Sequence, residues 1–312
     1  MRIISYTENG RTQGGVALGE HVVELGSAVA YAGFAIPDGG PLSVRVFLGL
    51  DYDRDAVLAA AVQLVKQGRV RPLSELRLAP PVPDPDKILC IGLNYRDHAE
   101  EAGLALPSEP MVFAKFRNCL IGAEDEVVLP DESERVDYEA ELAVVIGRRG
   151  RAITEERALD HIAGVTVFND VTARNLQLAT SQWTLGKSVD TFGPCGPYLV
   201  TLDEIPDLSD LRLRTLVNGR VVQDGSTSQM VFTVPQLVAY VSQAMTLEPG
   251  DIIATGTPAG VGFKRTPPIL LHHGDLVEVE IDSIGRLSNR VVNAVRAGSE
   301  PSRESAVGAG SR

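Results

Sequence analysis

Alternating carboxylates dominate the start of the segment 136–147. It reads Val-Asp-Tyr-Glu-Ala-Glu-Leu-Ala-Val-Val-Ile-Gly. Residues two apart on a strand point to the same side, so Asp137, Glu139 and Glu141 would share one face. Three unpaired carboxylates are costly to bury, and a hard divalent cation with oxygen ligands would offset their repulsion. The same pattern also fits a solvated acidic edge strand. The apolar run through Ile146 favours a strand that enters a core, and therefore the metal site.

A further acid follows another predicted strand. Residues 163–169 are apolar enough to form a core strand, and Asp170 comes directly after them. An acid in this position can serve as a third metal ligand, although an isolated aspartate there is more often a helix cap. The residues alone leave both roles open.

His98 and Glu101 lie three residues apart in a segment, 93–103, that is predicted to form one or two helical turns ending at Gly103. Residues at this spacing share one face of a helix. A carboxylate beside a histidine orients the ring and favours its protonated form, which is a common arrangement for a general base. Taken alone, however, the spacing is more typical of a surface ion pair.

Lys187 belongs to the tripeptide Gly186-Lys187-Ser188, which ends like a phosphate-binding loop. That motif requires a glycine five residues before Gly186, and Ser181 stands there, so the phosphate-loop interpretation fails. A lysine in a loop rich in glycine and proline is usually solvated, although sites for anionic substrates also use lysines in this way.

The composition limits the classes of partner. A chain of 312 residues with 44% hydrophobic content can build a sizeable core. Its net charge of -12 repels phosphate backbones, so we expect no nucleic-acid partner. No run approaches the roughly 18 apolar residues of a membrane span, and the N-terminus lacks the apolar core of a signal peptide. The three cysteines form no CxxC pair, which predicts free thiols in a reducing cytoplasm.

The elements that must position the candidate groups fall into two predicted domains. Residues 1–80 combine short alternating strands with an amphipathic helix and contain no catalytic cluster. The proline-rich stretch 80–85 is typical of a stiff, extended connector. Residues 81–295 carry every candidate group named above. Residues 296–312 are rich in Ser, Gly and Ala and are predicted to form a disordered tail.

Five motifs taken together resemble the fumarylacetoacetate hydrolase superfamily. In chain order they are Gly-Leu-Asn-Tyr-Arg-Asp-His-Ala-Glu-Glu (92–101), Asp-Tyr-Glu-Ala-Glu-Leu (137–142), Asn-Asp-Val-Thr-Ala-Arg (169–174), Gly-Lys-Ser (186–188) and Thr-Gly-Thr-Pro-Ala-Gly-Val-Gly (255–262). The resemblance runs from about Lys87 to Val292. It implies an α+β, predominantly β fold: a mixed β-roll catalytic domain around a central site, beside a small N-terminal α/β domain. It also implies a homodimer that binds Mg²⁺ or Mn²⁺, with Ca²⁺ able to replace them in a crystal.

The same resemblance assigns roles to individual residues. It implies that the metal ligands are Glu139, Glu141 and Asp170, and that Asp137 is not one of them. It implies that His98 and Glu101 form a catalytic pair on a mobile segment, which reverses the preference for a surface ion pair. Lys187 is similar to the lysine that contacts the substrate or metal-bound water. The residues that fall where the family binds the substrate carboxylate or nearby oxygens are Arg174, Gln177 and Thr257.

The implied function is metal-dependent hydrolysis of a carbon–carbon bond in a small, anionic 2,4-dioxo acid of the acylpyruvate or fumarylpyruvate type. In that reaction His98, held by Glu101, activates a water while the metal stabilises the enolate. Decarboxylation of oxaloacetate-like acids and isomerisation of unsaturated dioxo acids are alternatives on the same scaffold. The retained pair favours hydrolysis, because an attacking water needs a base. A non-catalytic metabolite-binding protein is the remaining alternative, against which the retained base argues.

Overall fold

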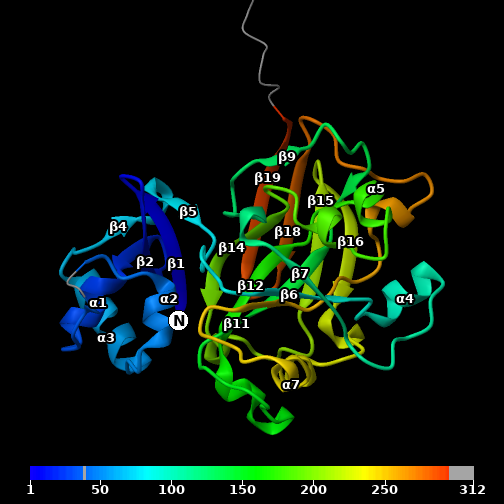
Figure 1. The fold of residues 1–312 in the computed structure, drawn as a ribbon. Helices are drawn as coiled ribbons and strands as arrows, with labels where there is room; N and C mark the ends of the chain where they lie inside the picture. The colour runs from blue at the N-terminus through cyan, green and yellow to red at the C-terminus, as the bar shows by residue number, and fades with distance from the viewer. Residues whose placement is uncertain (38–39, 295–312) are drawn as a thin grey trace, which may run out of the picture.

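One long mixed sheet crosses the computed structural model, which describes residues 1–37 and 40–294 (Figure 1). Its strand order is β4-β3-β2-β1-β14-β12-β11-β17-β6-β7. The strands in that order are β4 (Arg71–Pro72), β3 (His21–Glu24), β2 (Arg11–Leu18), β1 (Arg2–Glu8), β14 (Gly193–Val200), β12 (Ile162–Asn169), β11 (Ala140–Ile146), β17 (Ile252–Ala254), β6 (Ile88–Gly92) and β7 (Met111–Lys115). Two short strands extend it, with β5 (Arg77–Ala79) pairing with β1 and β8 (Leu120–Ile121) pairing with β14. The strand-rich mixture of sheets and helices confirms the predicted fold class.

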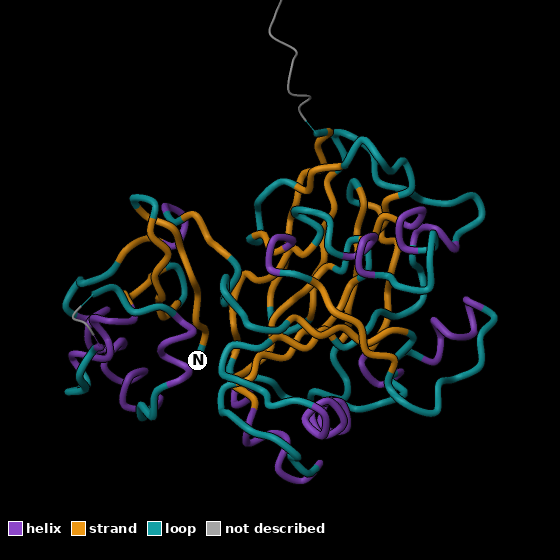
Figure 2. The backbone as a smooth tube through the Cα atoms, in the orientation of Figure 1, coloured by secondary structure: helices purple, strands orange, loops and turns teal. Residues whose placement is uncertain are grey.

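The N-terminal strands carry their own helices, α1 (Leu25–Tyr31), α2 (Val44–Gly49) and α3 (Arg54–Lys66) (Figure 2). The α3 helix begins where the Asp53 side chain accepts a hydrogen bond from the Ala56 N–H, which satisfies one of its free donors. Strand β1 pairs with β14, so this part shares a sheet with the rest of the chain. The division at residue 80 remains a prediction, and the predicted tail 296–312 lies outside the described residues.

A second sheet packs against one face of the long sheet, the face that carries Leu142 and Val165. Its strand order is β16-β15-β18-β19-β9. Its strands are β16 (Arg220–Ser226), β15 (Arg212–Val217), β18 (Leu276–Ile281), β19 (Gly285–Asn293) and β9 (Val127–Leu129). The turn between β15 and β16 places Asn218 and Gly219 at φ values of 51° and 76°, which suits the Asn-Gly pair.

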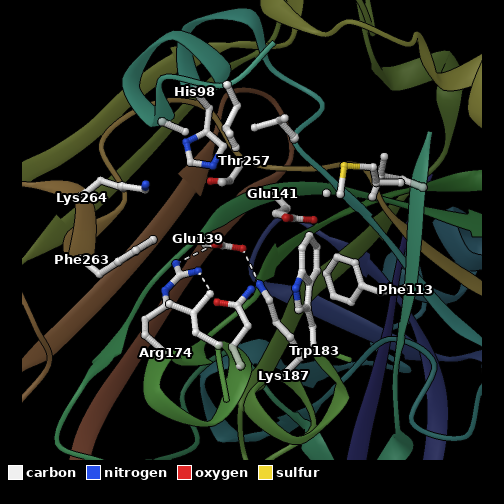
Figure 3. A pocket seen from close by; sticks show the side chains of 18 of the residues that line it. His98, Phe113, Glu139, Glu141, Arg174, Trp183, Lys187, Thr257, Phe263 and Lys264 are labelled. Carbon is white, nitrogen blue, oxygen red and sulfur yellow. Dashed lines mark hydrogen bonds and ion pairs between the residues drawn. The ribbon is translucent and has the colours of Figure 1, made fainter. Parts of the chain in front are cut away.

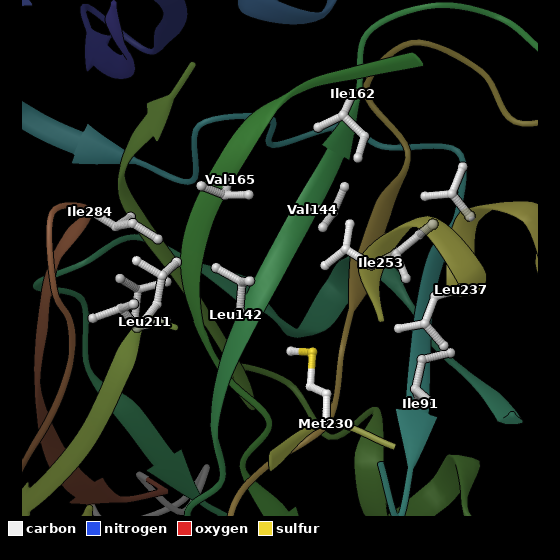
Figure 4. Close-up of a cluster of buried hydrophobic side chains, with 14 of the residues drawn as sticks. Ile91, Leu142, Val144, Ile162, Val165, Leu211, Met230, Leu237, Ile253 and Ile284 are labelled. Atoms are coloured by element: carbon white, nitrogen blue, oxygen red, sulfur yellow. The ribbon is translucent and has the colours of Figure 1, made fainter. Parts of the chain in front are cut away.

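The central strands are buried on both faces. Leu142 and Val144 of β11 pack in a cluster with Ile253 of β17 and with Leu237 of helix α7 (Val234–Ala244) (Figure 4). Ala143 of β11 points into a different cluster on the opposite face. This double burial explains why β11 is an unbroken apolar run after its acids, and it fixes the strand that presents them.

The predicted strand over 136–147 is interrupted. Val136–Asp137 form β10, which pairs with β13 (Thr172–Ala173), and β11 starts only at Ala140. The chain therefore changes partner strands at Tyr138 and Glu139. The predicted turns of helix over 93–103 are α4 (Arg96–Ala102), which ends at Gly103 with φ 67°. No helix among the described residues is long and apolar enough to cross a membrane.

Candidate active site

Three carboxylates converge where β11 and β12 pair. Glu141 lies within β11, Glu139 directly before it, and Asp170 directly after β12. The Asp170 N–H donates to the Glu139 carbonyl at 3.0 Å, which brings the two residues side by side. One ligand oxygen from each residue lies within 4.8 Å of the others, and all three residues are buried.

This donor set fits a hard divalent cation. The group contains only carboxylate oxygens, which Mg²⁺ and Mn²⁺ accept, and no soft sulfur or imidazole ligand. Three carboxylates so close together in a buried position repel one another, and a cation between them offsets that repulsion. Glu139, Glu141 and Asp170 are therefore the residues that could hold the metal.

Two buried lysines interleave with these acids. Lys187 Nζ lies 2.7 Å from Glu139 Oε2 and 2.6 Å from Asp170 Oδ2. Lys115 Nζ, at the end of β7, lies 2.7 Å from Asp170 Oδ1. The expectation that a lysine in the 186–188 loop is solvated is wrong, because Lys187 is 2% exposed. Lys115 had no assigned role in the sequence, since nothing near it in the chain indicates that β7 ends beside Asp170.

Asp137 holds Arg174 instead of joining the other acids. Arg174 Nε donates to Asp137 Oδ1 at 2.6 Å and Arg174 Nη2 to Glu139 Oε1 at 2.7 Å. The other oxygen of Asp137 accepts the Phe263 N–H at 2.8 Å. The strand-face argument could not separate Asp137 from the two glutamates. The break in the strand explains the difference, because Asp137 belongs to β10 and faces Arg174 across the β10–β13 pair.

Helix α4 carries His98 and Glu101 to the cavity. His98 Nδ1 lies 3.1 Å from Glu101 Oε2, and Glu101 Oε1 accepts the Gly260 N–H at 2.9 Å. The two side chains are only 13% and 22% exposed, so they do not form an ordinary surface ion pair. Asn94, just before the helix, donates to the carbonyls of Thr255 and Phe232, which fixes the entry of the segment.

Two single-turn helices, α5 (Arg174–Gln177) and α6 (Thr184–Lys187), approach each other through Gly186. A Cβ on Gly186 would lie 2.3 Å from the Gln177 backbone nitrogen. Only glycine therefore permits the contact that brings Lys187 beside Arg174 and Gln177. This is a structural reason for the glycine of the Gly-Lys-Ser sequence.

One cavity of about 430 Å³ joins these groups (Figure 3). All but two of the predicted site residues line it. The exceptions are Asp170, which lies behind Lys187, and Glu101, which lies behind His98. Its remaining walls are largely apolar. Lining residues that sequence reasoning did not identify include Phe113, Trp183, Phe263 and Lys264.

The comparisons with known proteins agree with this arrangement. The family described as "Fumarylacetoacetate (FAA) hydrolase C-terminal" matches residues 87–292, which include every residue of the site. The chain belongs to the fumarylacetoacetate hydrolase family. The predicted resemblance is thus confirmed, and the family's members are enzymes.

Relatives in the family carry different activities in their names. The human protein named oxaloacetate tautomerase FAHD2A, mitochondrial, is 48% identical over 241 residues, which cover 76% of this chain and 77% of that protein. The structure of a putative HpcE protein from Mycobacterium smegmatis is 38% identical, covers 95% of this chain and all of its own, and has a TM-score of 0.80. Maleylpyruvate hydrolase from Sphingobium sp. SYK-6, in complex with manganese(II) ion and pyruvate, is 30% identical with the same coverage and a TM-score of 0.76.

The two glutamates of the fumarylacetoacetate hydrolase site differ in their electrostatics. Burial raises the pKa of Glu141 well above its usual range, and the nearby charges of Asp170 and Glu139 raise it further. Burial also raises the pKa of Glu139, but the positive charges of Lys187 and Arg174 outweigh that effect and hold this pKa below its usual range. The same pairing keeps the pKa of Lys187 above its usual value despite burial. The site thus holds one well-neutralised carboxylate, Glu139, beside Glu141, to which no cationic side chain of the described residues is bound.

Proposed function

We propose that this enzyme interconverts the keto and enol forms of a small 2-oxo acid of the oxaloacetate type, with a divalent cation as cofactor. The observation that carries the proposal is that His98 and the glutamates of the acidic triad line one cavity. Keto–enol conversion needs only a group that binds a 2-oxo acid and a group that moves a proton, and we assign both roles to residues that line this cavity. The name of the human relative supports this choice of substrate.

Glu139, Glu141 and Asp170 would hold the cation, for which we propose Mg²⁺, with Mn²⁺ as the alternative. When bound, such an ion supplies Lewis acidity that stabilises negative charge on the substrate's oxygens. The manganese ion and pyruvate named with the maleylpyruvate hydrolase support a divalent ion and a 2-oxo acid in this family.

The hydrogen bonds around Arg174 leave specific donors for the substrate. Gln177 Oε1 accepts from Arg174 Nη1 at 3.1 Å, so its amide N–H groups remain available. Thr257 Oγ1 accepts from Gln223 Nε2 at 2.9 Å, which leaves its O–H free to donate. We assign these two donors, and the remaining N–H groups of Arg174, to the carboxylate and 2-oxo oxygens of the substrate. Lys187, fixed between two carboxylates, adds positive charge beneath them.

His98 moves the proton. Its Nδ1 is occupied by Glu101, so Nε2 is the nitrogen left to face a substrate. In the keto-to-enol direction, Nε2 removes a proton from C3, and the same proton is returned to the oxygen on C2. The reverse direction restores the C3–H bond, and neither direction consumes water. Glu101 fixes the ring and stabilises its charged form while it holds the proton.

Hydrolysis of a carbon–carbon bond is the second candidate. The His98–Glu101 pair can also deprotonate a water for attack on the distal carbonyl of a 2,4-dioxo acid, and the maleylpyruvate hydrolase neighbour favours this reading. Decarboxylation of oxaloacetate uses the same binding groups and no attacking water. Each reaction yields different products, so product analysis separates them.

The experiment follows the ultraviolet absorbance of freshly dissolved enolic oxaloacetate and, separately, of acetylpyruvate. Each is incubated with the purified protein and Mg²⁺ or Mn²⁺, and again with EDTA. EDTA-sensitive loss of enol with no pyruvate or CO₂ formed supports the tautomerase. Pyruvate and acetate from acetylpyruvate would favour the hydrolase, whereas CO₂ from oxaloacetate above the metal-only rate would favour the decarboxylase. No change in either compound would refute all three.

The homodimer and the cytoplasmic location remain predictions. Several relatives are named as mitochondrial, so the location of this chain needs its own measurement. Light scattering coupled to size-exclusion chromatography tests the dimer, for which the expected mass is twice 33.4 kDa.

A further inference from the structure

One cationic side chain at the cavity differs from all the others. Arg174 and Lys187 are each bound to two carboxylates. Lys264 also lines the cavity, but its side chain is exposed, and its ammonium has no ion-pair or hydrogen-bond partner among the described residues. A charge that the protein does not neutralise remains available to a ligand.

The short segment that carries Lys264 is held firmly in place. It is a single turn of 3₁₀ helix, η7 (Gly262–Lys264). The Phe263 N–H donates to the buried Asp137, and the Ile269 N–H donates to the Gly262 carbonyl at 2.9 Å. Arg265, the next residue, turns away and donates to the carbonyls of Gly260 and Val222. The backbone on which Lys264 stands is therefore fixed by contacts on both sides.

The ring of Phe263 directs the lysine. Lys264 Nζ lies 5.1 Å from the ring centroid, within the range of a cation–π contact. Arg174 Cζ lies 4.3 Å from the same centroid, so this aromatic ring separates the cation at the bottom of the cavity from the cation at its rim. In Figure 3 the Lys264 side chain reaches toward the space between His98 and Phe263, on the side opposite Trp183. The contact restrains the otherwise flexible lysine near the cavity.

This arrangement suits a ligand with negative charge at both ends. Under the function proposed above, the 2-oxo acid end binds at the carboxylates, Arg174 and Lys187. The far end of the molecule then lies toward the rim, where a carboxylate would meet the free ammonium of Lys264. We propose that Lys264 is a specificity residue that binds the second carboxylate of a 2-oxo dicarboxylic acid, and so selects dicarboxylates over monocarboxylates.

The test compares two ligands that differ only at the far end: 2-oxoglutarate, which ends in a carboxylate, and 2-oxopentanoate, which ends in a methyl group. Trp183 is the only tryptophan of the chain and lines the cavity, so its fluorescence reports binding of either ligand in the presence of Mn²⁺. We expect wild type to prefer 2-oxoglutarate by about five- to tenfold in Kd, as a partly exposed ion pair would give. Lys264→Met should abolish that preference, and Lys264→Arg should retain it.

Lys66→Met is the matched control. It removes the same charge from an exposed position at the end of α3, in the N-terminal part of the chain. It should leave the preference unchanged, whereas an equal loss would mean that only the overall charge matters. An unchanged preference in Lys264→Met would overturn the proposal while leaving the 2-oxo acid site intact. Failure of wild type to bind either ligand would instead overturn the proposed function, on which this inference rests.

The same variant separates binding from chemistry in turnover. Lys264→Met should raise KM for oxaloacetate by about fivefold and change kcat less, because the lysine binds the substrate but does not itself take or return the proton. An unchanged KM accompanied by a reduced kcat would contradict a role in binding the far carboxylate.

Discussion

The bottom and the rim of the cavity are built in opposite ways. At the bottom, Glu139, Glu141 and Asp170 stand at the ends of central strands. Lys187 is bound to two of these acids and Lys115 to one. At the rim, His98 stands on a seven-residue helix and Lys264 on a single helical turn. The bottom is buried and densely paired, while the rim is partly open and sparsely paired.

Under the proposed function the two regions have different tasks. The rigid carboxylates of the bottom would bind the 2-oxo acid end that many substrates have in common. The rim groups would meet the rest of the substrate, move the proton and select the far end. Relatives of this chain are named as tautomerases, isomerases and hydrolases, which is the variation expected if the rim and not the bottom diverges. The following substitutions test whether the two regions behave so differently.

Glu141→Gln should have the largest effect. The amide keeps the size of the side chain but removes a proposed ligand charge, so metal affinity should fall sharply. Loss of the several kcal/mol that a Lewis-acid cation provides corresponds to a drop of about 10³-fold in rate. Titration calorimetry with Mn²⁺ and the enol assay measure the two effects. The control is Glu100→Gln, which removes the same charge from an exposed side chain on α4. Equal Mn²⁺ affinity in the two variants would mean that Glu141 is not a metal ligand.

Lys187→Met should show that the bottom contributes to stability. It takes one cationic partner from each of two buried carboxylates, Glu139 and Asp170, which then keep only Arg174 and Lys115. The expected cost is about 3 kcal/mol in the free energy of unfolding, measured by urea titration in EDTA. Added Mn²⁺ should recover part of this loss, because the ion replaces the missing positive charge. Arg157→Met, which breaks an exposed ion pair with Asp160, should cost less than about 1 kcal/mol. Similar losses in both variants would contradict the contrast between buried and exposed pairs.

At the rim, His98→Ala should lose turnover but keep its affinity for Mn²⁺, unlike Glu141→Gln. Turnover should fall by about 10²-fold or more because the proton-transfer group is gone, while Mn²⁺ affinity stays within twofold of wild type (about 0.4 kcal/mol). Glu101→Gln should cost less, about tenfold, since the amide oxygen can still accept the Gly260 N–H. Wild-type turnover in His98→Ala would eliminate the proposed role of the histidine.

Gly92→Ala should have the smallest effect. A Cβ at Gly92 would lie 2.8 Å from Trp183 Cζ3, so the indole must shift, at a cost of about 1 kcal/mol in stability. The emission of this single tryptophan should change, while the buried charges remain in place. Gly49→Ala, where nothing lies within 4 Å, should leave the emission unaltered. An emission spectrum identical to wild type in Gly92→Ala would mean that the indole does not pack against this strand.

Local rules indicated two acids of the bottom, Glu139 and Glu141, but did not exclude Asp137 and left Asp170 open between a ligand and a helix cap. The family resemblance supplied the set of three, which stays a prediction as a ligand set. Glu141 lies on β11 and Glu139 directly before it, and Asp170 follows β12, which pairs with β11. The partners of these acids could not be predicted in the same way. Lys115 lies 55 positions before its partner Asp170. Asp137 does not share a strand face with the glutamates and instead binds Arg174, which is 37 positions away. Such pairs depend on which strands become neighbours, and that follows from the whole topology and not from local spacing.

The rim was harder still to predict. Phe263 and Lys264 follow a glycine-rich loop with no helical or strand periodicity, and their position depends on hydrogen bonds to Asp137 and Gly262. The motif resemblance identified the loop, but it could not indicate that Lys264 has no carboxylate partner within residues 1–37 and 40–294. Whether the charge of Lys264 is neutralised depends on all the side chains around it, and these come from distant parts of the chain.

The alternating acids and cations at the bottom affect how folding relates to ion binding. Asp137, Glu139, Glu141 and Asp170 carry at most four negative charges, and Lys115, Lys187 and Arg174 carry three positive ones. The chain therefore brings most of its own counter-charge to the place where an ion would sit. The fold therefore does not rely on an ion to balance these acids. Under the proposed function, the chain could fold first and bind its ion afterwards.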